Sequence, residues 1–357
     1  MTLLCFNPDH DICLADGGTH VTPPKMAALF AQQCAWIMAW CYREGYVLCS
    51  HPQPSLPQGA VAVSDIQGLP VDRVIAWGWD ATQRQRCIDL GISPTLLPTT
   101  QYIEQLRQWQ HRTTAAEAMR QLVGQIPSAL FPEVPQALSS LEDAEQYLST
   151  HGDVLFKAPW SGSGQGLRPV TRTLSDNDRG WVLNTIQRQR CVMAERRLDV
   201  VQDFAVEYLV DSQRVEKVGY SLFTTQGGAY KSNLLLSDDA IRQQLSTFVP
   251  LTLLDEVETF LEEWFARHLD TYQGPLGVDM LVYRTPDGHY GLHPLVEFNF
   301  RHTMGWVAHT LRQQHPEWDG KRFAVEFGDA EQFLSQPHHI LLTPVNAATR
   351  YCCSIRY

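Results

Sequence analysis

The sequence predicts a mixed α/β and α+β fold, with a Rossmann-like N-terminal domain followed by a second domain made of two smaller parts. The chain has 357 residues, which is more than one hydrophobic core usually serves. Short apolar strands alternate with helical segments over residues 1–98, and residues 274–301 have the pattern of a β-hairpin. Hydrophobic residues make up 44% of the chain and charged residues 19%, so the composition is that of an ordinary globular protein.

The first domain is expected to span residues 1–98 and to hold a parallel sheet with helices on its faces. Strands that alternate with helices are typical of such a sheet. Gly91 follows the last helical segment, as a C-cap does. No Gly-x-Gly-x-x-Gly motif occurs there, so the pattern gives no support for nucleotide binding by this domain. The expected elements are strand 2–6, a helical segment from Pro23 through Trp40, strands 46–49, 60–63 and 73–77, and helix 82–90.

Two acidic residues, Asp9 and Asp11, follow the first predicted strand directly, on either side of His10. Ligands of parallel α/β sheets bind beyond the carboxyl ends of the strands. Asp9 and Asp11 are therefore candidates for holding a cationic or amine substrate. The alternative is that they form only turns and helix caps, as loop carboxylates commonly do. Residues 77–80, Trp-Gly-Trp-Asp, either form a wall of the same cleft or pack in the core.

The net charge and the cysteine pattern indicate which kinds of partner the protein binds and in which cellular compartment it lies. A formal net charge of −11 argues against a nucleic-acid backbone as the main partner. No apolar run reaches the roughly 18 residues of a membrane span, and the apolar run at the N-terminus is too short for a signal peptide. The nine cysteines include no Cys-x-x-Cys pair, so we expect reduced thiols and a cytoplasmic protein without a membrane partner.

The predicted hairpin near the C-terminal end has the composition of a metal site. Its first arm carries Asp279, and its second arm carries Glu297 and Asn299, which are two residues apart and therefore point to one strand face. Oxygen ligands of this kind suit Mg²⁺. Each acid could instead be a solvated strand charge. Both acids lie inside apolar runs, where an unpaired carboxylate is costly, and this favours the metal site.

A lysine and a glycine-rich segment form a second candidate site. Residues 153–158 read as an apolar strand with Lys157 near its end, and residues 161–167, Ser-Gly-Ser-Gly-Gln-Gly-Leu, follow it. Small residues allow backbone N–H groups to surround phosphate oxygens. Alone, such a segment is more often a flexible hairpin tip, and the strand lysine just before it strengthens the case for a phosphate site. It is not a P-loop, because no Gly-Lys-Ser/Thr follows.

The order of these motifs resembles the ATP-grasp superfamily and, within it, the carboxylate–amine ligases. The resemblance covers residues 100–310 or so and implies a pre-ATP-grasp domain at 1–98, an N-terminal subdomain with the glycine-rich lid at 99–200 and a C-terminal subdomain with the metal site at 201–357. The motifs are, in chain order, Arg112, Lys157, the glycine-rich loop, Glu195, Asp203, Lys231, Asp279, Glu297-x-Asn299 and Arg301.

The resemblance implies that the nucleotide is ATP and assigns its contacts. Lys157 is expected at the α- and β-phosphates and Arg112 at a phosphate, although the family usually has Lys at the position of Arg112. Glu195 is expected to hold the adenine and Asp203 the ribose, with Glu207 as the alternative acid for the ribose. The lid residues expected at the phosphates are Ser161, Gly162, Ser163, Gly164 and Gly166.

The resemblance also implies metal and catalytic roles. Two Mg²⁺ ions, for which Mn²⁺ can substitute, are expected on Asp279, Glu297 and Asn299. Lys231, expected in a loop over residues 223–233, would reach the transferred phosphoryl group. Arg301 would hold the substrate carboxylate or the acylphosphate, which is a bidentate task that suits Arg.

The implied activity is an ATP-dependent ligase that joins a small-molecule carboxylate to an amine through an acylphosphate and releases ADP and phosphate. A small-molecule kinase on the same fold and a non-catalytic nucleotide-binding protein are the alternatives. Family members are often dimers, so a homodimer is one expected assembly. The residues themselves identify neither substrate.

Overall fold

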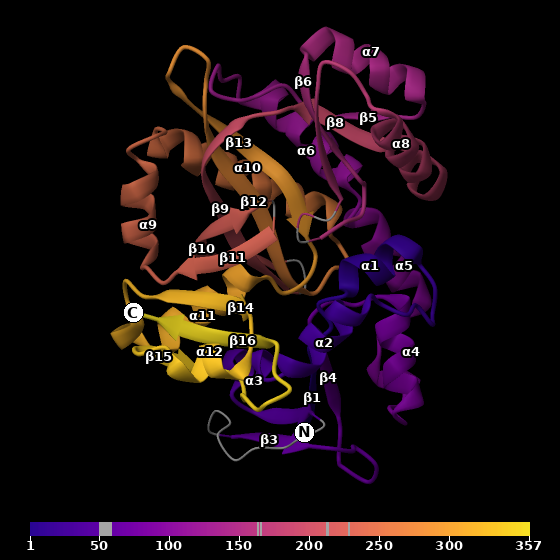
Figure 1. Ribbon diagram of the computed structural model, residues 1–357, viewed down its shortest axis with the longest axis vertical. Helices are drawn as coiled ribbons and strands as arrows, with labels where there is room; N and C mark the ends of the chain where they lie inside the picture. The colour runs from indigo at the N-terminus through magenta and orange to yellow at the C-terminus, as the bar shows by residue number, and fades with distance from the viewer. Residues whose placement is uncertain (50–58, 163, 165, 212–213, 228) are drawn as a thin grey trace.

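The structure is a computed structural model that describes residues 1–49, 59–162, 164, 166–211, 214–227 and 229–357. Within these ranges the strands form a parallel sheet of four strands, an antiparallel sheet of four strands and an antiparallel sheet of eight strands. In Figure 1 the parallel sheet lies at the bottom, the smaller antiparallel sheet at the top and the larger one between them. The predicted mixture of α/β and α+β structure is confirmed.

The N-terminal sheet has the parallel pairing expected from its alternating pattern, in the order β3-β2-β1-β4. The segment predicted as one helix from Pro23 is divided into two helices, and a short helix follows β1 where only a loop was expected. This short helix ends at Gly17, whose φ of 81° suits glycine. The elements are β1 (Thr2–Cys5), α1 (His10–Asp16), α2 (Lys25–Gln33), α3 (Ile37–Tyr42), β2 (Gly45–Leu48), β3 (Ala60–Val63), β4 (Arg73–Ala76), α4 (Ala81–Asp89) and η1 (Pro94–Leu96).

The smaller antiparallel sheet has the order β5-β8-β6-β7 and is covered on one face by α7 and α8. Val154 and Phe156 of β6 pack on those helices. Because side chains alternate along a strand, Lys157 points to the opposite face, where its pairing partner Met193 packs on Ala116 and Lys157 itself is buried. The elements of this part are α5 (Thr100–Trp109), α6 (Arg112–Gln125), β5 (Gln136–Leu138), α7 (Leu141–His151), β6 (Asp153–Lys157), β7 (Leu167–Thr171), α8 (Asp176–Gln189) and β8 (Val192–Arg196).

The larger sheet has the order β13-β12-β9-β10-β11-β14-β16-β15, and α5, α6, α9 and α10 contribute to the apolar core on one of its faces. Of residues 223–233, which were expected as a loop, 223–226 and 229–233 instead form the facing ends of β10 and β11. The elements are β9 (Asp199–Asp211), β10 (Arg214–Gln226), β11 (Ala229–Leu234), α9 (Asp238–Leu245), α10 (Leu251–His268), β12 (Gly274–Arg284), β13 (Tyr290–Asn299), α11 (Met304–Gln314), η2 (Pro316–Trp318), β14 (Arg322–Phe327), α12 (Ala330–Ser335), β15 (His339–Leu341) and β16 (Tyr351–Arg356).

The C-terminal strands share one apolar core with the N-terminal domain. Leu4 and Trp77 of the first domain belong to the same buried cluster as Phe323 of β14 and Ile355 of β16. The end of the chain therefore closes the molecule back onto its beginning, as Figure 1 shows for α2, α3 and β16. This shared core holds the loops after β1 and β4 at a fixed position relative to the large sheet.

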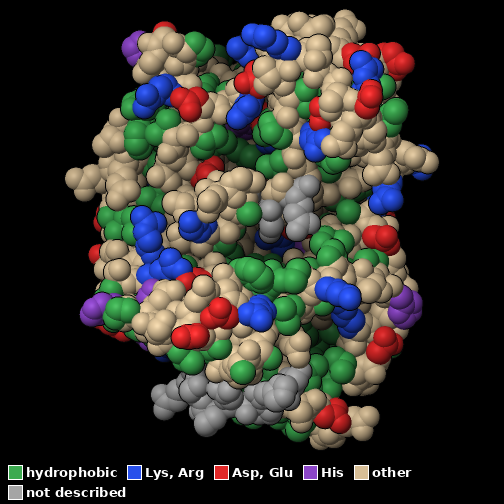
Figure 2. All heavy atoms as spheres, in the orientation of Figure 1, with side chains coloured by type: hydrophobic (Ala, Val, Ile, Leu, Met, Phe, Trp, Pro, Cys, Tyr) green, Lys and Arg blue, Asp and Glu red, His purple; other side chains and the backbone are tan. Residues whose placement is uncertain are grey.

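The surface carries both basic and acidic side chains, as the charged residues of the sequence lead us to expect. Basic and acidic side chains are interspersed over the face of the molecule that Figure 2 shows. Among the described residues, none of the helices combines the length and the apolar character needed to cross a bilayer.

We expect Phe323→Ala to lower the free energy of unfolding by about 3–5 kcal/mol, because it empties a fully buried aromatic site in the core that joins the two ends of the chain. Phe327→Ala is the matched control on the same strand, since Phe327 is 65% exposed and its truncation should change stability by less than about 0.5 kcal/mol. Urea denaturation followed by tryptophan fluorescence measures both. Equal effects of the two substitutions would show that the shared core does not stabilise the fold.

Candidate functional site

The predicted metal residues lie on one face of the large sheet. Asp279 of β12 is paired directly with Glu297 of β13, and Gly277 is paired with Asn299. Because residues opposite each other on neighbouring strands point to the same face, the two carboxylates and the amide lie together. The neighbouring residues Val278 and Phe298 point to the other face and pack in the core with α10. The alternation of the sequence thus places the oxygen ligands away from the core.

Crowding of carboxylates dominates the electrostatics of this face. Burial raises the pKa of Asp279 well above its ordinary value, and the negative charges of Glu297 and Glu207 raise it further, while Arg301 and Asn299 oppose the shift. A bound divalent cation would offset the repulsion between these carboxylates. In the described part of the chain no group of three or more His, Cys, Asp or Glu side chains has the arrangement of a metal site. Asp279, Glu297 and the Asn299 amide are the oxygen donors predicted for Mg²⁺, and this ligand set stays a prediction.

Arg112 links this acidic face to the glycine-rich loop. Its guanidinium forms an ion pair with Glu297 and donates to the Ser161 hydroxyl at 2.7 Å and to the Ala158 carbonyl at 2.5 Å. A second nitrogen donates to the Ser161 carbonyl at 3.2 Å. The residue that we expected at a phosphate thus holds the start of the lid against a proposed metal ligand. This pairing could not be read from the sequence, since the partners are 185 positions apart.

The lid lies close to the N-terminal domain. A Cβ atom at Gly162 would come within 2.1 Å of Asp11 Oδ2, and one at Gly166 would come within 2.2 Å of the Ser161 hydroxyl. Gly164 has a φ of 73°, which suits glycine. The glycines thus permit close backbone approaches that a larger residue would block. Ser163, which was expected to contact phosphate, lies outside the described residues.

Lys157 and Glu195 face each other across β6 and β8. Lys157 Nζ lies 2.6 Å from Glu195 Oε1, and both side chains are buried. Burial alone would raise the pKa of Glu195, but the charges of Lys157 and of His293, which lies 3.8 Å away on β13, lower it to about 2. His293 was not predicted as a site residue. Its signal in the sequence is a polar residue inside an apolar strand, and its partner on another sheet could not be inferred.

Asp203 and Glu207 of β9 extend the acidic face. Ala205, between them, pairs with Asp279, and Glu207 pairs with Gly277. The Thr225 hydroxyl donates to Asp203 at 3.0 Å, and burial raises the pKa of Asp203. Since residues two and four apart share a strand face, both candidates for the ribose contact point toward the metal residues.

Glu207 is the more deeply buried of the two acids, with 1% of its surface exposed. Its Oε1 accepts a hydrogen bond of 2.7 Å from Thr303, whereas its Oε2 has no hydrogen-bond partner among the described residues. Burial raises its pKa to about 7, against the lowering effects of Thr303 and Arg301. Thr303 was not predicted either. It caps the N-terminus of α11 and so connects that helix to the acidic face.

Lys231 lies apart from these groups in the structure. It is exposed on β11, and its Nζ donates to Gln226 at 3.1 Å across the β10–β11 hairpin. In the part of the chain that the structure describes, Lys231 makes this contact with Gln226 and forms no ion pair with the acids of β12 and β13. Its predicted contact with the transferred phosphoryl group stays a prediction.

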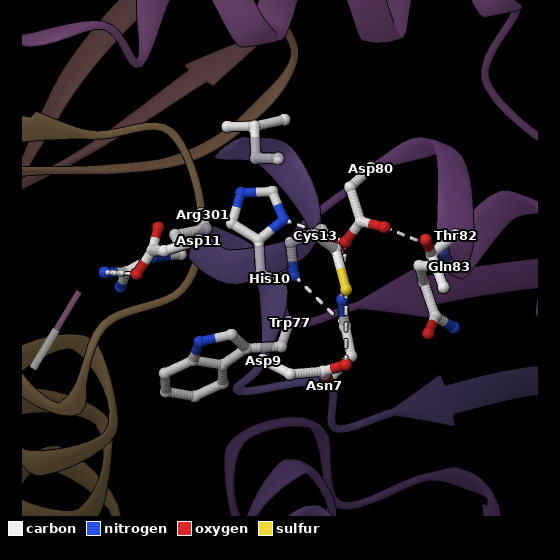
Figure 3. Close-up of polar contacts among 12 residues, drawn as sticks. Asn7, Asp9, His10, Asp11, Cys13, Trp77, Asp80, Thr82, Gln83 and Arg301 are labelled. Carbon is white, nitrogen blue, oxygen red and sulfur yellow. Dashed lines mark hydrogen bonds and ion pairs between the residues drawn. The ribbon is translucent and has the colours of Figure 1, made fainter. Parts of the chain in front are cut away.

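Asp9 and Asp11, the two acids near the N-terminus, have different partners. Figure 3 shows Asp11 beside Arg301. Asp11 accepts two hydrogen bonds from Arg301, at 3.2 Å from Nε and 2.9 Å from Nη2. Asp9 instead pairs with Arg86 of α4 at 2.8 Å and accepts from the Cys13 thiol. Asp11 therefore joins the predicted substrate residue Arg301, while Asp9 is engaged within the N-terminal domain.

Comparison with known proteins supports the fold. The sequence matches no family model, and no curated protein matches it at a significant level. Solved structures do match. Biotin carboxylase from Campylobacter jejuni, solved as a βγ-ATP complex, has a TM-score of 0.51 and 12% identity, over 81% of this chain and 71% of that chain. N5-carboxyaminoimidazole synthetase from Staphylococcus aureus, complexed with ADP, has a TM-score of 0.50 and 11% identity, over 91% and 90%.

A third structure belongs to the same group. The biotin carboxylase domain of the 2-oxoglutarate carboxylase of Hydrogenobacter thermophilus, a dimer in complex with MgADP, ADP and bicarbonate, has a TM-score of 0.51 and 11% identity, over 90% of this chain and 83% of that chain. Identities this low show the fold alone. The chain therefore has the fold of these biotin carboxylase and N5-carboxyaminoimidazole synthetase structures, and the fold that the resemblance to the ATP-grasp superfamily implied is confirmed.

Proposed function

We propose that the protein is an ATP-dependent ligase that joins a carboxylate to an amine through an acylphosphate and releases ADP and phosphate. The observation that carries this proposal is the pairing of Asp279 with Glu297 on one sheet face, with Arg112 connecting Glu297 to the glycine-rich loop. Acids that suit a metal and a loop that suits phosphates thus meet at one place. The nucleotides bound in the structural neighbours support ATP as the substrate.

The nucleotide contacts follow from the two sheets. Lys157 lies on the face of the smaller sheet that is turned away from α7 and α8, at the end of the strand before the glycine-rich loop, so we assign it to the α- and β-phosphates. Glu195, which is its present partner, is assigned to the adenine side, and Asp203 to the ribose. Arg112 and the backbone of the loop at 161–166 are assigned to the phosphates. Lys157 and Arg112 are both paired with carboxylates, so each has a partner to exchange for phosphate.

Asp279, Glu297 and Asn299 would hold Mg²⁺, in two ions, and Mn²⁺ suits the same oxygen donors. When bound, the metal neutralises charge on the β- and γ-phosphates during phosphoryl transfer. The raised pKa of Asp279 supports this assignment, because carboxylates crowded on one face favour a bound cation.

The chemistry that we propose has two steps. A carboxylate oxygen of the substrate attacks the γ-phosphorus, so a P–O bond forms, ADP leaves and an acylphosphate results. The amine nitrogen then attacks the acyl carbon and phosphate leaves. Arg301, oriented by its two hydrogen bonds to Asp11, is assigned to the carboxylate and acylphosphate oxygens, and Lys231 to the transferred phosphoryl group. The lid excludes water, which would hydrolyse the acylphosphate.

We place the enzyme in the cytoplasm, because buried thiols such as Cys13, Cys34 and Cys353 are free and fit a reducing compartment. We propose a homodimer, because the Hydrogenobacter neighbour is a dimer. The proposed partners are small molecules, with neither nucleic acid nor a membrane among them.

ADP release with Mg²⁺-ATP and pools of amino acids and small carboxylates tests the proposal. Release should require both a carboxylate and an amine and should stop when EDTA removes the metal. Asp279→Asn and Glu297→Gln should each reduce the rate by about 100-fold or more, because each removes a charge that holds the metal. Asp287→Asn is the matched control in the turn between the same strands, where its side chain is 71% exposed, and should retain activity. A phosphorylated product without an amine requirement would identify a kinase instead.

Glu207 should make the metal-free protein less stable as pH rises. Its pKa is raised from 4.5 to about 7, so the folded state keeps a proton that the unfolded state has already released between these values. Stability is therefore fully present below pH 4.5 and falls as pH rises through 7, by at most about 3 kcal/mol. Urea denaturation at pH 5, 6, 7 and 8 measures this fall. Glu207→Gln should flatten it, whereas Glu256→Gln on the exposed face of α10 should not. An unchanged slope in Glu207→Gln would contradict the raised pKa.

A further inference from the structure

A buried histidine and aspartate meet at the centre of the N-terminal sheet. In the order β3-β2-β1-β4, the chain runs outward on one side of β1 and returns to the other side with β4. Ligands of parallel α/β sheets bind where the strand order reverses, beyond the carboxyl ends of the two central strands. The loop after β1 carries Asn7 and leads into His10, the first residue of α1, and the loop after β4 carries Gly78 and Asp80. These four residues therefore occupy the expected ligand position of the sheet.

The imidazole of His10 is held by Asp80. His10 Nδ1 lies 3.2 Å from Asp80 Oδ2, and the two residues are 2% and 1% exposed. The same carboxylate accepts from the Gln83 backbone at 2.8 Å and from Asn7 Nδ2 at 3.3 Å. A carboxylate can only accept, so we assign the proton to Nδ1, and Nε2 keeps its lone pair. The pair thus presents Nε2 as a base.

The ring is also fixed from its side. A Cβ atom at Gly78 would lie 2.6 Å from His10 Cγ, so the ring rests directly on the Gly78 backbone. Asn7 holds that backbone by donating to the Gly78 carbonyl at 2.8 Å and accepting from its N–H at 3.3 Å. Such support fixes the orientation of a side chain, as an acid–base group in a site requires.

The second ring nitrogen faces away from this support. Figure 3 shows His10 between Asp80 on one side and Asp11 with Arg301 on the other. Within the described ranges, the hydrogen bond of the His10 ring is made by Nδ1, to Asp80. The next residue along α1, Asp11, holds Arg301, to which we assigned the acylphosphate oxygens. The histidine therefore lies beside the residues assigned to the acyl group.

We propose that His10, oriented by Asp80, accepts the proton that the amine loses when it attacks the acylphosphate. As the C–N bond forms, the C–O bond to phosphate breaks and phosphate leaves, while the N–H proton passes to Nε2. This step rests on the proposed ligase function. His10 is then a catalytic residue of the second step, and Asp80 is a positioning residue that keeps the required tautomer.

Two assays on the full-length protein separate the steps. Hydroxylamine, which reacts as a neutral nucleophile near pH 7, traps the acylphosphate as a hydroxamate without a base. The carboxylate and amine that support ADP release by the wild-type enzyme report on amide formation. His10→Gln should slow amide formation by about 100- to 10,000-fold, the usual contribution of an acid–base group. Its hydroxamate formation should stay within about threefold of wild type, since the first step does not use this base.

Further variants test how the pair works. Asp80→Asn keeps a good N-cap for α4 but offers the wrong group to Nδ1, so it should show the same split between the two assays. Free imidazole should restore amide formation to His10→Gly, which a structural role would not allow. His309→Gln is the matched control, because His309 is a buried histidine near an aspartate, 3.8 Å from Asp238, on α11. In this variant, amide formation should not fall relative to hydroxamate formation.

The outcomes distinguish the two proposals. Equal losses of hydroxamate and amide in His10→Gln, or full retention of both, would overturn the role of His10 and leave the ligase function standing. Absence of hydroxamate and of ADP release from the wild-type enzyme with every carboxylate would overturn the ligase function and this step together.

Discussion

The fold brings carboxylates together on one face of the large sheet, and this crowding is the constraint on which the site depends. Asp279 and Glu297 are paired across β12 and β13, and Glu207 lies on the next strand. Like charges on adjacent strands are unfavourable, more so when partly buried. The apolar residues between them, Val278 and Phe298, pack in the core and prevent the strands from shifting register. Packing in the core therefore keeps the carboxylates of Asp279 and Glu297 close together, and their mutual repulsion favours the binding of a cation between them.

The cations of the site come from elements far apart in the sequence. Arg112 at the start of α6 pairs with Glu297, and Arg301 pairs with Asp11 of the first domain. The second pair can form only because the N-terminal domain and the C-terminal strands share one core, in which Trp77 and Phe323 are both buried. No functional residue was predicted in the C-terminal strands. Their structural role is to hold the first domain against the site.

Much of this arrangement could be predicted from local patterns. Strand alternation placed Asp279, Glu297 and Asn299 on one face, and the strand before the glycine-rich loop placed Lys157 beside it. Long-range partners could not be predicted, because nothing in the sequence near Glu195 indicates His293. The interpretation of residues 223–233 as a loop was wrong, because pairing between β10 and β11 organises a segment whose glycine and polar residues are typical of a turn.

Lys157 and Arg112, the two cations assigned to the phosphates, are both paired with carboxylates. Lys157 is held by Glu195 and Arg112 by Glu297, so neither side chain is left unpaired when no nucleotide is bound. An unpaired buried charge is costly, and these pairs avoid that cost. Under the proposed function, phosphates would replace the carboxylates at both cations, and a metal would replace Arg112 at Glu297. ATP alone would leave Glu297 without a partner and the metal alone would leave Arg112 without one, so the geometry favours their joint binding over the binding of either one.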